Sequence, residues 1–373
     1  MRIEFGDLRF DERTRKQIED VLKNNWISEG PKVKEFEKKF GELFGYRHNI
    51  SMSSGTSADM ASCMALYEFG AKQGDEIIAP ALAFAAVGNS IRAAGFSPKF
   101  VDIERETLNI NPRLIEEKIT PRTKAIIAVH TMGKPCKMDS IMDIAKKHGF
   151  YVIEDCCEAH GAKYKGKFVG NWGDMAAFSF YAAHLICSAE GGMVSTNNFD
   201  MAEILRSVKS HGRKPGSLYF DHLRFGLNFK MNDVEAAFAL PQVEDFWKTF
   251  NKRKENMYYL LGLVKDLETF AWFNSEDADE TVCAHAFTVT LKKPGRCNEL
   301  YEYLEKNSIK CKRNFGSMPT QHKAFEYLGY KLGDFPEAEY VGNNGIHFGI
   351  HQYLSKEDLD YISDKLHEFF RKN

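Results

Sequence analysis

Apolar and polar positions alternate with two different periods along the chain, and each period predicts its own kind of element. Apolar residues three and four apart on charged backgrounds predict amphipathic helices over 12–24 and 31–43, and Pro31 suits the first turn of the second. Further helices are predicted over 53–69, 139–148, 200–210, 234–264, 297–306 and 356–370. Short apolar runs predict strands over 74–80, 99–103, 124–130, 151–153, 175–181 and 284–291.

The order of these elements predicts the fold class. Strands alternate with helices across 75–196, which is the pattern of an α/β protein whose mainly parallel sheet is covered by helices on both faces. Beyond Asp266 the strands have an antiparallel pattern, which predicts a smaller α+β unit. We therefore expect a large domain over 1–245, with an amino-terminal arm over 1–30, and a small domain over 246–373.

Composition narrows the function classes. The 373 residues carry a formal charge of −2 with acids and bases interspersed, so no basic stripe indicates nucleic acid. No apolar run approaches the ~20 residues that span a bilayer, and Met1-Arg2 leads into mixed charge rather than a secretory segment. We expect a cytoplasmic protein with no membrane partner.

The eight cysteines raise the possibility of disulfides or a metal site. Most of them lie in apolar runs, where a free cysteine behaves as a small core residue, and no Cys-x-x-Cys pair or zinc spacing is present. Structural thiols, without a bound metal, are the prediction.

Charged residues gather at the ends of two predicted strands. The run that starts at Tyr151 ends on Glu154 and Asp155, and the run 175–181 is followed by His184 and by the turn Glu190-Gly191-Gly192. The carboxyl ends of parallel strands form the edge at which α/β proteins bind ligands. A polar strand end without a function is the competing interpretation.

A glycine turn opens the helix predicted over 53–69. Free amides at a helix amino terminus, reached through Gly55 and Thr56, form a site for phosphate. An ordinary helix cap, made by Thr56 or Ser57, would explain the same residues.

Taken in chain order, these motifs resemble the DegT/DnrJ/EryC1/StrS nucleotide-sugar aminotransferases, which are fold type I enzymes that use pyridoxal phosphate. The family pattern reads Glu-Asp-x-x-Gln-x-His-Gly, then Phe-Ser-Phe, a lysine five residues after that serine, and Gly-Glu-Gly-Gly. This chain carries Glu154-Asp155, Glu158, His160-Gly161, Phe178-Ser179-Phe180 and Ala189-Glu190-Gly191-Gly192. The resemblance covers nearly the whole chain and implies an aspartate-aminotransferase-like fold.

The resemblance also implies a role for each matching residue. The cofactor phosphate would lie on the turn of Gly55 and Thr56 and on Ser179, with Phe84 stacked on the pyridine ring. Asp155 would pair with the ring nitrogen and Glu158 would lie close to the ring hydroxyl. Asn228 would reach the partner's cofactor phosphate in a homodimer whose active sites are shared between subunits. A core phenylalanine is the alternative for Phe84.

Where the aminotransferases have their lysine, this chain has His184. Histidine has no primary amine to hold the cofactor's aldehyde covalently, but with an ordinary pKa of about 6.5 it can take a proton. His184, the pair Asp155 and Glu158, and the segment that contains His351 resemble the 3-dehydratase branch, whose type is GDP-4-keto-6-deoxy-D-mannose 3-dehydratase. The branch that adds an iron–sulfur cluster needs a Cys-x-Cys pair, which is absent from the sequence.

The branch implies a substrate and a reaction. L-Glutamate would convert pyridoxal phosphate to pyridoxamine phosphate, whose amine condenses with the C4 ketone of a nucleotide-diphosphate 4-keto-6-deoxy sugar. His184 would then move the proton as the C3 hydroxyl leaves, with His211 assisting, and Arg313 and His351 would contact the substrate. A loop histidine without a role and an exposed arginine are the alternatives for His211 and Arg313. A sugar aminotransferase and a catalytically silent paralogue remain rival functions.

Overall fold

The computed structural model describes residues 3–214 and 216–371. The prediction that the chain has no secretory segment rests partly on Met1 and Arg2, which lie outside these residues. Among the helices of the described residues, none combines the length and the apolar character needed to cross a bilayer.

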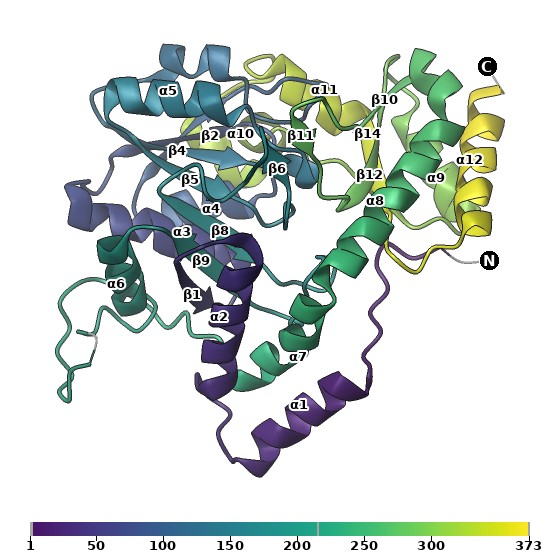
Figure 1. Ribbon diagram of the computed structural model, residues 1–373. Coiled ribbons are helices and arrows are strands. Elements are labelled where there is room, and N and C mark those ends of the chain that lie inside the picture. The colour runs from purple at the N-terminus through teal and green to yellow at the C-terminus, as the bar shows by residue number, and fades with distance from the viewer. Residues whose placement is uncertain (1–2, 215, 372–373) are drawn as a thin grey trace.

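A seven-stranded sheet forms the centre of the larger part of the molecule (Figure 1). Its strands in spatial order are β1 (His48–Met52), β9 (Gly192–Thr196), β8 (Met175–Ser179), β5 (Tyr151–Asp155), β4 (Thr123–Val129), β2 (Glu76–Pro80) and β3 (Ser97–Val101). β9 runs antiparallel to β1 and β8, and the other pairs are parallel. The predicted mainly parallel sheet is confirmed.

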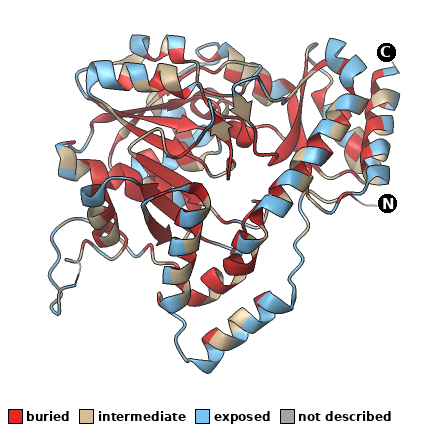
Figure 2. Ribbon diagram, viewed as in Figure 1, coloured by how far each residue is buried: buried red, intermediate tan, exposed pale blue. Residues whose placement is uncertain are grey.

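Helices cover this sheet on both faces, as the unbroken apolar strands require. The α-helices are α1 (Glu12–Lys23), α2 (Pro31–Phe44), α3 (Gly55–Ala65), α4 (Ala86–Ala93), α5 (Met138–His148), α6 (Phe199–Val208), α7 (Asp233–Glu244), α8 (Phe246–Leu263), α9 (Cys297–Lys306), α10 (Met318–Gln321), α11 (Pro336–Asn344) and α12 (Lys356–Arg371). Alternate strand residues face opposite cores: Ile77 and Ile153 pack on the side of α3 and α4, while Ile78 and Val152 pack on the side of α5. Figure 2 shows the sheet buried between these layers.

A second, antiparallel sheet follows in the last third of the chain. Its order is β10 (Ala271–Phe273), β12 (Ala286–Leu291), β14 (Gly345–Gly349) and β13 (Cys311–Arg313). Residues of α8, α9 and α12 pack with it into a separate core, which Ile3 also joins. The smaller α+β region is therefore present, whereas the proposed boundary between 245 and 246 stays a prediction.

Short elements complete the description. A third sheet has the order β11 (Glu280–Thr281), β6 (Lys163–Tyr164) and β7 (Lys167–Phe168). The 3-10 helices are η1 (Leu66–Phe69), η2 (Pro112–Leu114), η3 (Glu116–Lys118), η4 (Thr131–Gly133), η5 (Lys265–Thr269) and η6 (Lys323–Leu328). β11 pairs with β6, so a segment late in the chain adds a strand to one that follows β5.

The helix predicted over 234–264 is two helices, α7 and α8. Pro241 lies in the last turn of α7, where it supplies no N–H to the helical ladder, and Asp245 leaves the helical conformation with φ −90° and ψ 6°. The prediction of one long helix was therefore wrong at its middle. α8 packs against the second sheet.

Candidate functional site

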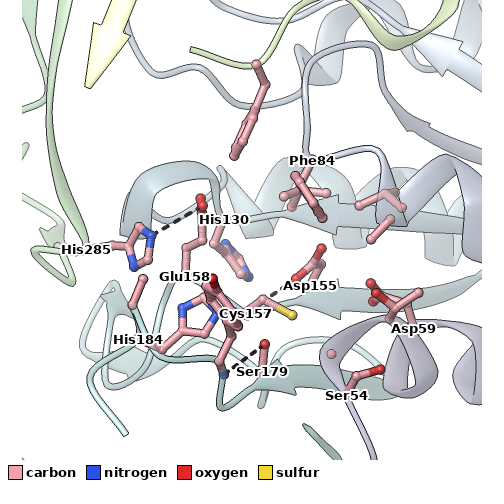
Figure 3. Close-up of a pocket in the computed structure, with 18 of the residues that line it drawn as sticks. Ser54, Asp59, Phe84, His130, Asp155, Cys157, Glu158, Ser179, His184 and His285 are labelled. Carbon is pink, nitrogen blue, oxygen red and sulfur yellow. Dashed lines mark hydrogen bonds and ion pairs between the residues drawn. The ribbon is translucent and has the colours of Figure 1, made fainter. Parts of the chain in front are cut away.

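A cavity of about 440 Å³ lies where β5 and β8 end, facing the amino terminus of α3 and residues of the second sheet. Figure 3 shows the side chains that line it. Eight of the predicted site residues line this cavity: Gly55, Thr56, Phe84, Asp155, Glu158, Ser179, His184 and Arg313. The sheet edge that the sequence singled out is thus the wall of a pocket.

Three predicted site residues are not among the lining residues. His211 is exposed in the loop after α6, with a left-handed φ of 59°. Asn228 is exposed near the end of the same loop. His351 is buried at 5% exposure, where its ring accepts a hydrogen bond from the N–H of Tyr353 at 3.3 Å. Their roles stay predictions.

Asp155 ends β5 beside Ser179, which ends β8. The Oδ1 atom of Asp155 accepts a hydrogen bond from the N–H of Cys157 at 3.0 Å. Burial raises the pKa of the Asp155 carboxyl above its usual value, and the Cys157 hydrogen bond acts in the opposite direction. A cation placed beside this carboxylate would favour its ionised form.

The first turn of α3 points its amides toward the cavity. Ser54 is the helix cap: its hydroxyl accepts from the N–H of Ser57, whose own hydroxyl accepts from the N–H of Ser54. The cap is therefore Ser54 rather than Thr56 or Ser57, although Ser57 takes part as the second member of the capping box. A Cβ atom at Gly55 would lie 2.6 Å from the Cβ of Ser179, so only glycine allows β8 to approach this helix end.

His184 lies in the turn after β8, between two other histidines. Its ring centroid is 5.8 Å from that of His160 and 5.1 Å from that of His285. Burial, and then the neighbouring His160 and Arg253, hold the pKa of His184 well below its usual value. The imidazole is therefore neutral at pH 7, and its Nδ1 atom has no hydrogen-bond partner among the described residues.

Glu158 faces this histidine group across the cavity. Its Oε2 atom accepts from the N–H of Met132 at 2.6 Å, and its Oε1 atom lies 3.5 Å from Nε2 of His285. Burial raises the pKa of Glu158 to about 7, with the charge of Asp155 acting in the same direction. A carboxyl group that titrates near neutrality can both give and take a proton at physiological pH.

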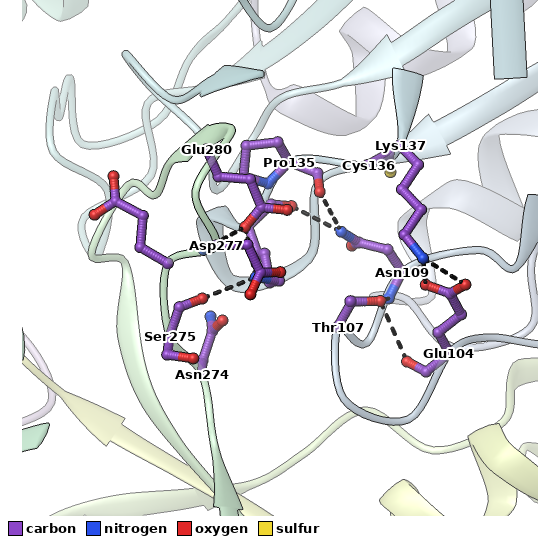
Figure 4. Close-up of polar contacts among 12 residues, drawn as sticks. Glu104, Thr107, Asn109, Pro135, Cys136, Lys137, Asn274, Ser275, Asp277 and Glu280 are labelled. Atoms are coloured by element: carbon purple, nitrogen blue, oxygen red, sulfur yellow. Dashed lines mark hydrogen bonds and ion pairs between the residues drawn. The ribbon is translucent and has the colours of Figure 1, made fainter. Parts of the chain in front are cut away.

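The turn that supplies the Met132 amide is held by Asn109. The side chain of Asn109 accepts from the N–H of Thr131 and donates to the carbonyls of Lys134 and Pro135, each at 2.9 Å. Figure 4 shows the bond from Asn109 to Pro135. These bonds fix the main chain around Met132, whose φ of 54° is unfavourable for a side chain. Asn109 therefore positions the donor that holds Glu158.

Two basic residues border the cavity next to each other on β13. The guanidinium of Arg313 donates to the carbonyls of Gly342 at 3.1 Å and Asn343 at 2.8 Å, in the last turn of α11, and also to the Asn298 side chain. Such bonds satisfy the free carbonyls of a helix end. Lys312 is exposed and places its Nζ atom 4.3 Å from the ring centroid of Phe5. Its ammonium is thus the cation better placed for an anionic ligand.

Sequence reasoning missed several lining residues. Asp59, His130, His285, Lys312 and His347 also line the cavity. Three of them carried a local signal. Asp59 follows Thr56 by three residues on a predicted helix, and Lys312 precedes Arg313. His130 ends the predicted strand 124–130, so the rule that placed Asp155 at the sheet edge applied to it as well. His285 and His347 lie on elements far from the motifs, and only the tertiary fold brings them there.

The lining residues fit pyridoxal phosphate. A helix amino terminus next to Ser179 suits a phosphate, and Asp155 suits a protonated ring nitrogen. Four buried polar atoms of the lining residues have no hydrogen-bond partner among the described residues: Oδ1 of Asp59, Nδ1 of His184, Nδ1 of His285 and Nε of Arg313. Such atoms are costly unless a polar ligand or water meets them.

Comparisons with known proteins agree with this geometry. Residues 9–367 match the model of the DegT/DnrJ/EryC1/StrS aminotransferase family. GDP-perosamine synthase of Escherichia coli is 32% identical over 361 residues, which cover 96% of each chain.

Solved structures agree as well. The Helicobacter pylori aminotransferase PseC superposes with a TM-score of 0.93 at 25% identity over 100% of both chains. A GDP-4-keto-6-deoxymannose 3-dehydratase, solved as a histidine-to-asparagine variant with GDP-perosamine, superposes with a TM-score of 0.88 at 27% identity. That match covers 98% of this chain and 100% of the other.

Proposed function

Because the chain belongs to the DegT/DnrJ/EryC1/StrS aminotransferase family, we propose that it is a pyridoxal-phosphate-dependent 3-dehydratase of a nucleotide-linked 4-keto-6-deoxyhexose. The family and the fold predicted from the sequence are confirmed by the comparisons. The cofactor is pyridoxal 5′-phosphate, with pyridoxamine 5′-phosphate as its aminated form, as the family and the lining residues both indicate.

One observation carries the dehydratase proposal: His184 occupies the position of the family's lysine and lines the cavity. A chain with histidine there has no amine with which to form a covalent bond to the cofactor. It keeps a proton acceptor, because burial holds the imidazole neutral. Of the reactions known for such a site, dehydration needs the base and dispenses with the covalent link.

The low pKa of His184 suits a proton that has to be passed on. A neutral imidazole accepts a proton at its ring nitrogen, and the buried imidazolium that results is a stronger acid than a solvated one. The same side chain would therefore be able to take up a proton in the cavity and deliver it to the departing C3 hydroxyl of the substrate, which would leave as water. The cofactor supplies the electron sink for this step.

The remaining residues bind and orient. Gly55, Thr56 and Ser179 hold the phosphate, and Phe84 covers one face of the ring. Asp155 keeps the ring nitrogen protonated, and Glu158 meets the ring hydroxyl or the substrate. Lys312 attracts the nucleotide diphosphate at the outer end of the cavity, where Arg313 orders the neighbouring turn.

We also propose that the active protein is a homodimer. The loop after α6 exposes a group of large apolar side chains: Leu218 at 93%, Tyr219 at 81% and Phe220 at 84%. Exposed patches of this kind mark interaction surfaces. Asn228 and His211 lie in the same loop, so a partner subunit that covers it would bring both residues toward a second cavity.

The test is a product assay. The protein, pyridoxal phosphate and L-glutamate are incubated with 4-keto-6-deoxyhexoses linked to GDP, CDP, UDP or dTDP, and the sugars are analysed by mass spectrometry. We expect loss of oxygen from one substrate together with release of ammonia. An amino sugar formed without ammonia would instead identify an aminotransferase. Cofactor binding without turnover of any substrate would identify a silent paralogue.

A further inference from the structure

Asp59 is an unexplained carboxyl group in the cavity wall. It lies on the second turn of α3, its side chain is 1% exposed, and its Oδ1 atom has no hydrogen-bond partner among the described residues. A buried polar atom without a partner costs stability, and an apolar side chain of similar size would avoid that cost. Helix packing therefore does not explain a carboxyl group at position 59.

The nearest acid to Asp59 is Asp155. One carboxylate oxygen of Asp59, one of Asp155 and the Sγ atom of Cys157 all lie within 4.8 Å of one another. Figure 3 shows the carboxyl groups of Asp59 and Asp155 facing each other in the cavity wall. Both residues line the cavity, and one oxygen of Asp155 already accepts the Cys157 N–H.

We propose that Asp59 is a second cofactor-binding carboxylate, which forms with Asp155 a pair that receives the protonated ring nitrogen of the cofactor. In the free protein two buried carboxyl groups this close hold one proton between them, because both cannot be ionised without repulsion. When the pyridinium N–H arrives, its positive charge lies between the two groups, so both can be ionised and the shared proton is released.

The surroundings of the pair support one shared proton. Burial, followed by the charge of Asp155, holds the pKa of Asp59 well above its usual value. The other titratable groups that interact with the two carboxyls are Cys63 of α3, Cys156, Cys157 and Glu158 after β5, and His130 and Cys136 after β4. Thiols are neutral near pH 7 and Glu158 is itself an acid, so neither kind of group neutralises the pair. His130 acts in the opposite direction, by lowering the pKa of Asp155, and the arriving ring nitrogen adds the positive charge that the pair lacks.

The proposal rests on the cofactor and is independent of whether the enzyme dehydrates or transaminates. It predicts a proton count. The wild type should release about one proton more on binding pyridoxamine phosphate than the variant Asp59→Asn, which has a single ionisable group in the pair. The difference is the same whether the cofactor arrives protonated or takes its proton from the pair.

The experiment is calorimetric titration of the cofactor-free protein with pyridoxamine phosphate in buffers of different ionisation enthalpy. Asp59→Asn is nearly isosteric, and a circular dichroism melt verifies that it folds. Asp174→Asn is the matched control: it removes another carboxyl whose pKa burial raises, but one that lies outside the cavity lining. We expect the control to match the wild type.

Two further readouts make the result specific. The ratio of the Kd of Asp59→Asn to that of the wild type should rise by up to about tenfold per pH unit, in the range where the free pair holds its proton. An analogue with a C–H group in place of the ring nitrogen should abolish the difference in proton count. Equal proton counts for the wild type and Asp59→Asn would overturn the proposal. A wild type that does not bind the cofactor would overturn the cofactor assignment as well. The number of protons released does not depend on which sugar product forms, so failure of the dehydratase proposal would not affect this test.

Discussion

Replacing Glu158 by Gln should stabilise the cofactor-free protein, and the gain should grow with pH. Burial raises the pKa of Glu158 from 4.5 in the unfolded chain to about 7 in the fold. A group of this kind contributes its full stability below pH 4.5 and loses it as the pH rises through about 7. Wild-type protein therefore carries a penalty at neutral pH that glutamine, which has no charge to desolvate, does not carry.

The size of the penalty follows from the shift. Moving the pKa from 4.5 to about 7 corresponds to about 3 kcal/mol once the pH exceeds both values. The side chain is 17% exposed, so solvent screens little of this. Glutamine keeps an oxygen for the Met132 N–H, which preserves the 2.6 Å hydrogen bond.

The assay is the unfolding midpoint in denaturant and in heat at fixed protein concentration from pH 5 to pH 8. We expect Glu158→Gln to unfold at a higher midpoint than the wild type at pH 8, and the gain at pH 5 should be about a quarter as large. Glu117→Gln, at an exposed position of η3, should show no such trend. A gain that does not change with pH, or a loss at every pH, would refute the reasoning.

Other substitutions test the proposed roles of the lining residues. His184→Lys should allow borohydride to fix the cofactor to the new amine, seen by peptide mass spectrometry, and should lower dehydration at least about tenfold. Borohydride labelling of another lysine in the wild type would show that the site is misplaced. Lys312→Ala should raise KM for the nucleotide sugar by about tenfold with little change in Tm. Arg313→Ala should lower Tm by a few degrees, because about 1 kcal/mol of hydrogen bonding to the end of α11 is lost. The reverse pattern in KM and Tm would contradict these two roles. Gly55→Ala should raise the Kd of the cofactor by at least about tenfold in a fluorescence titration, because the added methyl meets Ser179. Unchanged binding would place the phosphate elsewhere.

Much of the fold follows from local rules that a sequence displays. Pro31 begins α2, as its position predicted, and Gly149 adopts the left-handed conformation that ends α5 directly after the predicted helix 139–148. The edge strand β1 and the strands β13 and β14 were not predicted, because they are short and their pairing partners lie far away in sequence. Pairing of that kind is decided by tertiary contacts.

The candidate site divides in the same way. Asp155, Ser179 and His184 lie within 30 residues of one another, so strand ends and spacing were enough to bring them together in a prediction. His285 enters from the start of β12 and Lys312 from β13, and no local pattern indicates that these strands face the end of β5. The sequence shows Asp59 as a polar residue in a predicted helix, but its proposed role depends on its closeness to the carboxyl group of Asp155, which only the tertiary structure reveals.

Because histidine replaces the family's lysine, the cofactor would have to be held by the other residues of the cavity. With no amine at position 184, the proposed function requires that retention depend on the α3 amides at the phosphate and on carboxyl groups at the ring nitrogen. A pair of carboxyls discriminates a protonated ring from a neutral one more strongly than a single carboxylate does, because each negative charge adds to the attraction. The same pair leaves the aminated form of the cofactor free to exchange, since nothing covalent restrains it. The proposed role of Asp59 therefore explains why a chain with His184 would keep an unpartnered carboxyl group there. Charge at the ring nitrogen would hold the cofactor that no covalent bond at position 184 can hold.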